Sequence, residues 1–464
     1  MNNVRADMSS IDERDATRFR LSRPFQTAGP PAIVSTALPA RILLYVIGLY
    51  AGLVWPLVLR HIGGSANDEG GSVFNQLLWV VFGGFAVSLM LANYKPAAVS
   101  RITRSHMFLI ALLSWFLLST AWSLAPGATI RRVALQVIII VSVTSCVIAI
   151  SNARVICDDI LYFFGIATVV NWLSLVLLPP TPIGYAGIYL SKNNFGAFAA
   201  LMVLFALPRL LAPSIRIRLV SGFVLASATV FLVVSKAKTS MGLSVIVPEL
   251  SLALLVFGTI SRINVVVLTA ATLFCIAILV GVIIEIVGVA PDDFLTAVFG
   301  DPTFTNRTAI WGFAGKFIST RPWQGYGYGG FWQIGDASPV LHGGAAWMTG
   351  AINQAHNLYV DLMLQGGYIA LALFIFQLGL TISRSSYLSG WQLRDKATAL
   401  GVIYYSALYN FFDTTLFRSF NSAWIYFIVA SALIGLGSYA GETTERSQTT
   451  ALGRDERLAA TIRR

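Results

Sequence analysis

The chain has 464 residues, of which 56% are hydrophobic and only 11% are charged, and its formal net charge is +11. A soluble domain carries roughly 25% charged residues, so this composition excludes an ordinary soluble protein. It indicates a chain that is largely surrounded by lipid.

The N-terminal segment, residues 1–38, is polar and bears several arginines. It lacks the short apolar core and small-residue cleavage site of a secretory signal peptide, so we interpret it as a flexible cytoplasmic tail. Apolar windows of about 20 residues, long enough to cross a bilayer as a helix, then recur along the chain. Twelve lie near residues 39–59, 73–92, 106–122, 133–150, 159–178, 194–212, 217–235, 240–258, 263–288, 356–380, 397–412 and 422–438.

These windows predict an all-α polytopic membrane protein with about 12 transmembrane helices. Nine helices fall in residues 39–288 and three in residues 356–438, and residues 439–464 form a second flexible tail. The windows near 106, 397 and 422 are the shortest. With both termini in the cytoplasm, 22 of the 32 Lys and Arg residues lie on the cytoplasmic side, as the positive-inside rule requires. This bias explains the net charge, so no nucleic-acid partner is expected.

The remaining basic residues oppose this bias, and most of them lie at the ends of predicted helices. Arg131 and Arg132 open the fourth window, Lys192 precedes the sixth, and Lys236 and Lys238 separate the seventh from the eighth. Each of them alone could simply reach the lipid headgroups. As a set on the outer face they favour an anion-binding surface.

A long loop, residues 289–355, follows the ninth window, and its aromatic content favours a folded cap over a disordered segment. The apolar positions from Ile310 to Ile318 have helical spacing after Thr305 or Asn306, and this helix should end before Pro322. Arg307 falls in its first turn, where the helix dipole disfavours a cation. A bound anion would remove that conflict; the alternative is a solvated surface arginine.

The run RPWQGYGYGGFWQIG comes next and begins with Arg321. Its glycines allow a ligand to approach the backbone closely, and the rings of Trp323, Tyr326 and Tyr328 could pack against a sugar. An aromatic belt at the membrane interface is the alternative interpretation.

His356 and Asn357 begin the tenth window. A histidine at the outer membrane boundary can accept a proton from a hydroxyl, or it can be a hydrogen-bonded packing residue at a helix start. On a helix, Asp361 would lie one turn below Asn357, and the pair Gly366 and Gly367 would let a neighbouring helix pack closely.

Other potential functional groups are few. Glu249 and Glu285 lie inside apolar windows, where an ionisable group is a functional candidate. The three cysteines lie in or beside apolar windows and predict no disulfide framework. The chain has no DxD pair, no HExxH and no Walker loop, so neither a metal nor a cofactor is expected.

The segments TNRTAIW, RPWQGYGYGGF and AHNLYVDLMLQGGY, in this order, resemble the shared domain of the O-antigen ligase and O-antigen polymerase superfamily. The segments SKNNFGAF and SKAKTS are similar to that family's basic motifs on the outer face. The resemblance covers roughly residues 187–376. It is closest to the Wzy-type polymerases of exopolysaccharide repeat units.

This resemblance implies a GT-C-like glycosyltransferase architecture in the bacterial inner membrane, with its active face in the periplasm. The donor would be an undecaprenyl-diphosphate-linked oligosaccharide, and a flippase and a chain-length regulator would be partners. By position, His356 matches the proposed catalytic base and Arg307 the arginine that binds the diphosphate. The outer-face basic motifs are matched by Lys192, with Asn193 beside it, and by Lys236 and Lys238, which replace the arginines of many relatives and lack their bidentate geometry.

We therefore expect polymerisation of lipid-linked repeat units, by attack of a sugar hydroxyl on the diphosphate-bound glycan. Arg131, Arg132, Arg321 and Asn357 are further substrate-binding candidates. One alternative is an O-antigen ligase, which differs only in its acceptor, the lipid A core. A flippase for lipid-linked glycans is an alternative of another class, although transporters place their charges near the bilayer midplane.

Overall fold

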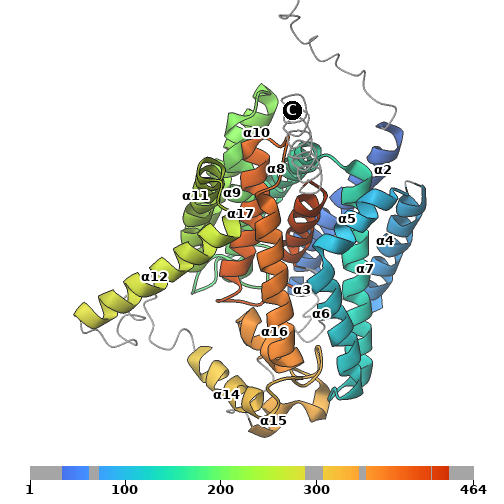
Figure 1. Cartoon of the computed structure of the whole chain (residues 1–464), viewed down its shortest axis with the longest axis vertical. Coiled ribbons are helices and arrows are strands. Elements are labelled where there is room, and N and C mark those ends of the chain that lie inside the picture. Colours follow the sequence, from blue (N-terminus) through green and yellow to red (C-terminus); the bar gives the residue numbers. More distant parts are fainter. Residues whose placement is uncertain are drawn as a thin grey trace, which may run out of the picture.

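The computed structural model describes residues 34–61, 73–92, 94–287, 307–343, 348, 352–419 and 421–437. Every named element in these ranges is a helix (Figure 1). The N-terminal half contains α2 (Val34–Leu49), a π-helical turn (Tyr50–Val54), α3 (Trp55–His61), α4 (Val73–Ala92), α5 (Pro96–Ser105), α6 (Met107–Leu118), α7 (Pro126–Ile150), α8 (Ala153–Leu177) and α9 (Lys192–Ala206). The remainder contains a 3-10 turn (Leu207–Leu211), α10 (Ile215–Ser235), α11 (Lys238–Ser261), α12 (Val265–Val287), α14 (Arg307–Thr320), α15 (Pro339–Gly343), α16 (Leu358–Ser385), α17 (Leu393–Tyr409) and a helix at Ser422–Gly437.

All twelve apolar windows contain a helix, which confirms an all-α polytopic membrane protein. In the described ranges, nine helices are long and apolar enough to span a membrane, or ten if α5 and α6, bent by 70° from one another, form one span. The windows that fall short are the three shortest: α6, α17 with 17 residues, and Ser422–Gly437. The predicted count of twelve spans is therefore not confirmed. α2 begins at Val34, so residues 34–38 of the predicted N-terminal tail are helical. The rest of that tail, the whole of the C-terminal tail and residues 289–306, 344–347 and 349–351 of the loop lie outside the described residues.

Apolar side chains cover the outside of the bundle as well as its core. Leu211 and Val176 are more than 80% exposed, and the apolar window of α12 has no buried residue. α12 diverges from the other helices in Figure 1. A soluble protein rarely exposes so much contiguous apolar surface, so these helix faces lie against lipid.

α9 is the central helix of the bundle. Each residue from Phe195 to Ala206 is buried, and α9 contacts α8, α10, α11 and α17. An unbroken apolar helix of this kind requires neighbours on every side. Its first residue, Lys192, is thereby fixed at the same end of the bundle as the start of α11.

A buried arginine ties the opposite end of the bundle together. The guanidinium of Arg209 donates to Asp158 at 3.0 Å, to Asp395 at 2.8 Å and to the hydroxyl of Thr398 at 3.0 Å. Arg209 is fully buried, so it needs these acceptors to offset the lost solvation. The cluster joins the 3-10 turn after α9 to the starts of α8 and α17.

α16 is broken at Gly367, where φ is 69° and ψ is −169°. The break frees the carbonyls of Leu364 and Gln365, which accept from the amides of Tyr326 at 2.8 Å and Gly327 at 2.9 Å. A Cβ at Gly367 would lie 2.1 Å from the carbonyl oxygen of Trp323. The glycine-rich loop after α14 is therefore held against α16 by backbone contacts.

The neighbouring glycine behaves as predicted. Gly366 faces α6, whose Trp115 indole donates to the Gly366 carbonyl at 2.8 Å. An added Cβ at Gly366 would lie 3.0 Å from the ring of Phe116. A neighbouring helix thus approaches Gly366, whereas a loop approaches Gly367.

Candidate functional site

The candidate site lies at the end of the bundle where α9, α11 and α16 begin and α17 ends. The first amide of α16, that of Leu358, donates to the carbonyl of Asn410 just after α17 at 2.9 Å. The Asn410 side chain accepts from the amide of Thr415 at 2.8 Å. The hydroxyl of Tyr409 donates to the carbonyl of Asn193 at 3.3 Å. The segment from Asn410 to Ser419 is thus fixed beside the starts of α9 and α16.

His356 lies in this end region, next to Asp413. The His356 Nδ1 is 3.3 Å from Asp413 Oδ1, and the His356 side chain is 34% exposed whereas that of Asp413 is 8% exposed. The Gln354 amide nitrogen is also near Nδ1, at 3.2 Å. An Nδ1–H···carboxylate bond is charge-assisted and therefore outweighs a bond from the neutral amide. In the neutral imidazole this places the hydrogen on Nδ1 and leaves the Nε2 lone pair able to accept a proton.

Arg307 acts on the same carboxylate. Burial alone would raise the pKa of Asp413, but the hydrogen bond and charge of His356, the Thr414 amide at 2.9 Å and the charge of Arg307 together lower it below its usual range. Asp413 is therefore an anion at neutral pH. His356 contacts this anion directly, whereas Arg307 influences it only through its charge.

His356 lies just before α16 and not in its first turn. Its φ is 49°, in the left-handed region, and α16 begins two residues later at Leu358. Asn357 is the N-cap, and its side-chain oxygen accepts from the amides of Tyr359 at 2.9 Å and Val360 at 3.2 Å. The Asn357 side chain is thus used for capping, and the unwound backbone before the cap turns His356 toward Asp413.

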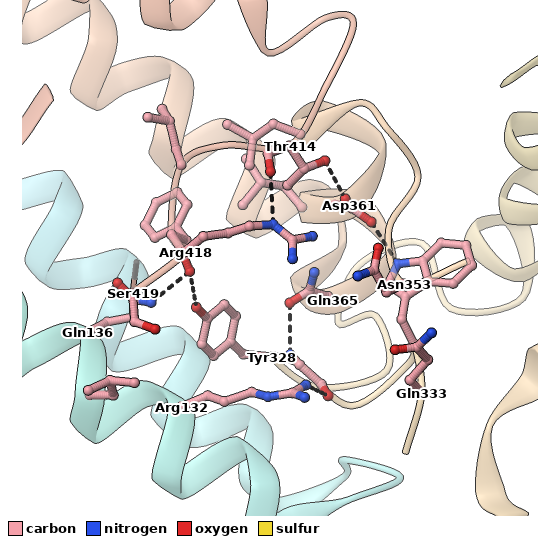
Figure 2. Close-up of a pocket in the computed structure, with 17 residues that line it drawn as sticks. Arg132, Gln136, Tyr328, Gln333, Asn353, Asp361, Gln365, Thr414, Arg418 and Ser419 are labelled. Carbon is pink, nitrogen blue, oxygen red and sulfur yellow. Dashed lines mark hydrogen bonds between the residues drawn. The ribbon is translucent and has the colours of Figure 1, made fainter. Parts of the chain in front are cut away.

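A cavity of about 90 Å³ adjoins this group, and Figure 2 shows that it is lined from both sides by arginine. Arg132 reaches it from α7 and donates to the Gly329 carbonyl. Arg418 reaches it from the segment after α17, donating to Thr414 O at 2.8 Å and to Gln354 Oε1 at 3.0 Å. Gln354 therefore connects Arg418 to His356. Burial lowers the pKa of Arg418 to about 9, so this group is still a cation at neutral pH.

Asp361 forms the third charged wall of the cavity. It accepts from the Thr414 hydroxyl at 2.6 Å (Figure 2). It also accepts from the Trp332 indole at 2.7 Å and from the Ala355 amide at 3.1 Å. Thr414 is the neighbour of Asp413 in sequence, and Ala355 is the neighbour of His356. Asp361 therefore holds the two segments that carry the His356–Asp413 pair.

The predicted lysines gather at the start of α9. Lys192 Nζ donates to the Ile183 carbonyl at 3.0 Å. Lys192 is also close to Ser235, the residue before Lys236, because a Cβ added at Gly184 would touch both of them. Lys236 caps α10 with φ 54°, and Lys238 is the first residue of α11. All three belong to the end of the bundle that holds His356.

Other predicted residues lie differently. Arg131 is exposed and does not line the cavity. Arg321 stacks on the Tyr326 ring, with 4.8 Å between the guanidinium carbon and the ring centroid. Tyr326 is buried among other side chains, which leaves its face unavailable to a sugar, whereas Trp323 is 64% exposed.

Tyr328 lines the cavity instead of forming an open platform. Its ring stacks on Phe116 with 4.4 Å between centroids, and its hydroxyl donates to the Phe417 carbonyl at 3.1 Å. Glu249 and Glu285 are exposed on α11 and α12 and do not line the cavity.

The sequence analysis did not identify Asp413 or Gln354, and it placed Arg418 only among the basic residues outside the cytoplasm. The polar segment NFFDTTLFRSFN between the last two apolar windows could have indicated Asp413 and Arg418 as candidates. Its length suits a simple connection, and only the fold brings it to His356.

The sequence matches no family model and no curated protein. The family resemblance therefore remains an expectation based on the motifs themselves.

Proposed function

We propose that the protein is a membrane glycosyltransferase that polymerises polyprenyl-diphosphate-linked oligosaccharide repeat units. The observation that carries this proposal is the partly exposed His356, whose Nδ1 lies 3.3 Å from the buried carboxylate of Asp413. A base oriented by a carboxylate and surrounded by cations suits deprotonation of a hydroxyl beside an anionic leaving group.

In the proposed reaction, Nε2 of His356 accepts the proton of an acceptor sugar hydroxyl. The hydroxyl oxygen attacks the anomeric carbon of the donor, and the bond from that carbon to the diphosphate oxygen breaks. The lipid diphosphate leaves with the bonding electrons as an anion, whose charge Arg307 and the lysines at the start of α9 and α11 stabilise. A diphosphate leaves already ionised, so the step needs no general acid.

The site's position at one end of the bundle supports this chemistry over transport. Its cations and histidine gather where several helices begin, whereas a transporter places its ligand groups near the bilayer midplane. Residues 307–343 add a cap over this end, with α14 and α15 outside the bundle in Figure 1.

The test is a reconstitution of the full-length protein with an undecaprenyl-diphosphate-linked repeat unit. A ladder of products supports the polymerase, a single transfer to added lipid A core supports an O-antigen ligase, and unchanged substrate contradicts both. The variants His356→Ala and Arg307→Ala should abolish the product. Two matched controls, His342→Ala and Lys316→Ala, change an exposed histidine and an exposed cation of the same cap and should retain activity.

A further inference from the structure

A second large groove lies at the end of the bundle opposite His356. It has a volume of about 900 Å³ and is formed where α11 and α16 end and α12 and α17 begin. The 24 residues of α11 and the 28 residues of α16 separate it from the candidate site. At 1.5 Å per residue α11 is about 36 Å long, slightly more than a hydrocarbon core of about 30 Å. The groove therefore lies at the headgroup level of the opposite leaflet.

The groove is positively charged. Arg262, in the turn between α11 and α12, and Lys396, in the first turn of α17, line it, and none of its described lining residues is acidic. The nearest acid in sequence, Asp395, is bound to the buried Arg209 at 2.8 Å. Its charge is thus already compensated by a partner outside the groove.

Hydroxyl groups add neutral donors between these cations. The Ser386 hydroxyl oxygen accepts from the amide of Val265 at 2.9 Å, so its own proton is left to donate. Ser389 and Tyr387 also line the groove and are exposed. Two cations with several hydroxyls form a suitable surface for phosphate oxygens.

An apolar cleft continues from this groove along the membrane-spanning part of α11 and α12. It has a volume of about 400 Å³ and is lined mainly by apolar side chains, including Leu254, Phe257, Leu268 and Leu279. The two spaces adjoin, because Gly258 of the groove would place a Cβ 3.5 Å from Leu268 of the cleft. A polar groove at headgroup level that opens into an apolar cleft fits an amphipathic ligand.

We propose that this groove and cleft bind an anionic phospholipid of the bilayer. Its phosphate lies between Arg262 and Lys396, and one acyl chain occupies the cleft between α11 and α12. Basic pockets between transmembrane helices recognise acidic headgroups. A zwitterionic lipid would bring a cation of its own into a groove whose lining offers it no carboxylate. The inference does not depend on the proposed reaction.

Native mass spectrometry of the purified full-length protein tests the headgroup. We expect phosphatidylglycerol to bind more tightly than phosphatidylcholine with the same chains. The double variant Arg262→Gln/Lys396→Gln should weaken phosphatidylglycerol binding about 25-fold, or about fivefold for each cation. Phosphatidylcholine binding by the same preparation should weaken less, and an unchanged unfolding temperature would show that the variant is folded.

A matched control removes equal charge at the same end of the bundle. Arg216 and Arg218 are exposed at the start of α10 and do not line the groove, so Arg216→Gln/Arg218→Gln should leave phosphatidylglycerol binding unchanged. Equal binding of the two lipids, or an equal loss in this control, overturns the proposal.

The acyl chain is tested separately from the phosphate. Ala271→Phe fills the cleft and should weaken phosphatidylglycerol binding, whereas glycerol phosphate and inorganic phosphate should not displace the lipid. Displacement by either of them at the concentration of the lipid would identify a site for free phosphate and contradict the lipid assignment.

Discussion

Replacing Asp413 by Asn tests the core of the proposed mechanism, because it removes a charge and almost no volume. Asp413 contacts His356 Nδ1 at 3.3 Å and has no proposed contact with substrate. An asparagine amide can donate to Nδ1, which would leave Nε2 protonated and unable to accept a proton from the acceptor hydroxyl. The rate of glycosyl transfer should therefore fall only because His356 can no longer act as a base.

The size of the loss follows from the geometry of the pair. The distance of 3.3 Å is longer than an ideal charge-assisted bond, so we take the lower end of the range, about 1.5 kcal/mol. That energy corresponds to a rate reduction of about twelvefold. Loss of the correct tautomer removes the base as well, which is worth about 10²–10⁴-fold. We expect a rate reduction between these bounds for Asp413→Asn.

The assay is the initial rate of chain extension in proteoliposomes containing the lipid-linked repeat unit. If Asp413 acts only through His356, the double variant His356→Ala/Asp413→Asn should be no slower than His356→Ala. Asp336→Asn is the matched control, an exposed acid of the cap, and should keep the normal rate. Full activity of Asp413→Asn, or additive losses in the double variant, would refute the proposed role of this pair.

Three further predictions concern stability, each measured by thermal unfolding of the purified protein. Since the pKa of Asp413 is lowered on folding from 3.8, its ionised form stabilises the fold above about pH 4 and this effect is lost as pH falls further. The difference in unfolding temperature between the native chain and Asp413→Asn should accordingly shrink as pH falls below 4. Gly367→Ala should destabilise by at least about 2 kcal/mol, since its φ of 69° is strained for alanine and the new Cβ would overlap Trp323. Gly379→Ala, in the same helix with open space around it, should be neutral or stabilising. Arg209→Leu should cost about 3–5 kcal/mol, because the buried Asp395 and the partly buried Asp158 each lose their shortest ion pair; an unchanged unfolding temperature would show that the cluster does not hold this end of the bundle.

The membrane class and most helices could be predicted from the sequence because they depend on local hydrophobicity. A run of about 20 apolar residues needs lipid or a protein core wherever it lies. The helix at Arg307–Thr320 was predicted in the same way, since its apolar residues Ile310, Phe313 and Ala314 recur at helical spacing and are buried. The number of spans could not be predicted in this way, because the length of a short helix such as α17, with 17 residues, depends on the segments that pack against its ends.

The composition of the site depended on contacts between distant segments. Asp413 lies 57 residues from His356, and Arg132 lies 197 residues from the Gly329 carbonyl that it contacts. The spacing of apolar residues along the chain does not predict contacts between residues so far apart in sequence. The left-handed conformation of His356 was also unpredictable from its sequence, because it results from Asn357 capping α16 and from the packing of the segment after α17.

The sequence by itself determined that the chain is a helical membrane protein with basic and histidine side chains near the helix ends, because hydrophobicity and charge act locally. Only the tertiary structure decided which of these side chains meet. Backbone hydrogen bonds join two distant segments, the loop at Tyr326 and the segment that begins at Asn410, to the first turns of α16. These contacts create the His356–Asp413 pair and the cavity beside it.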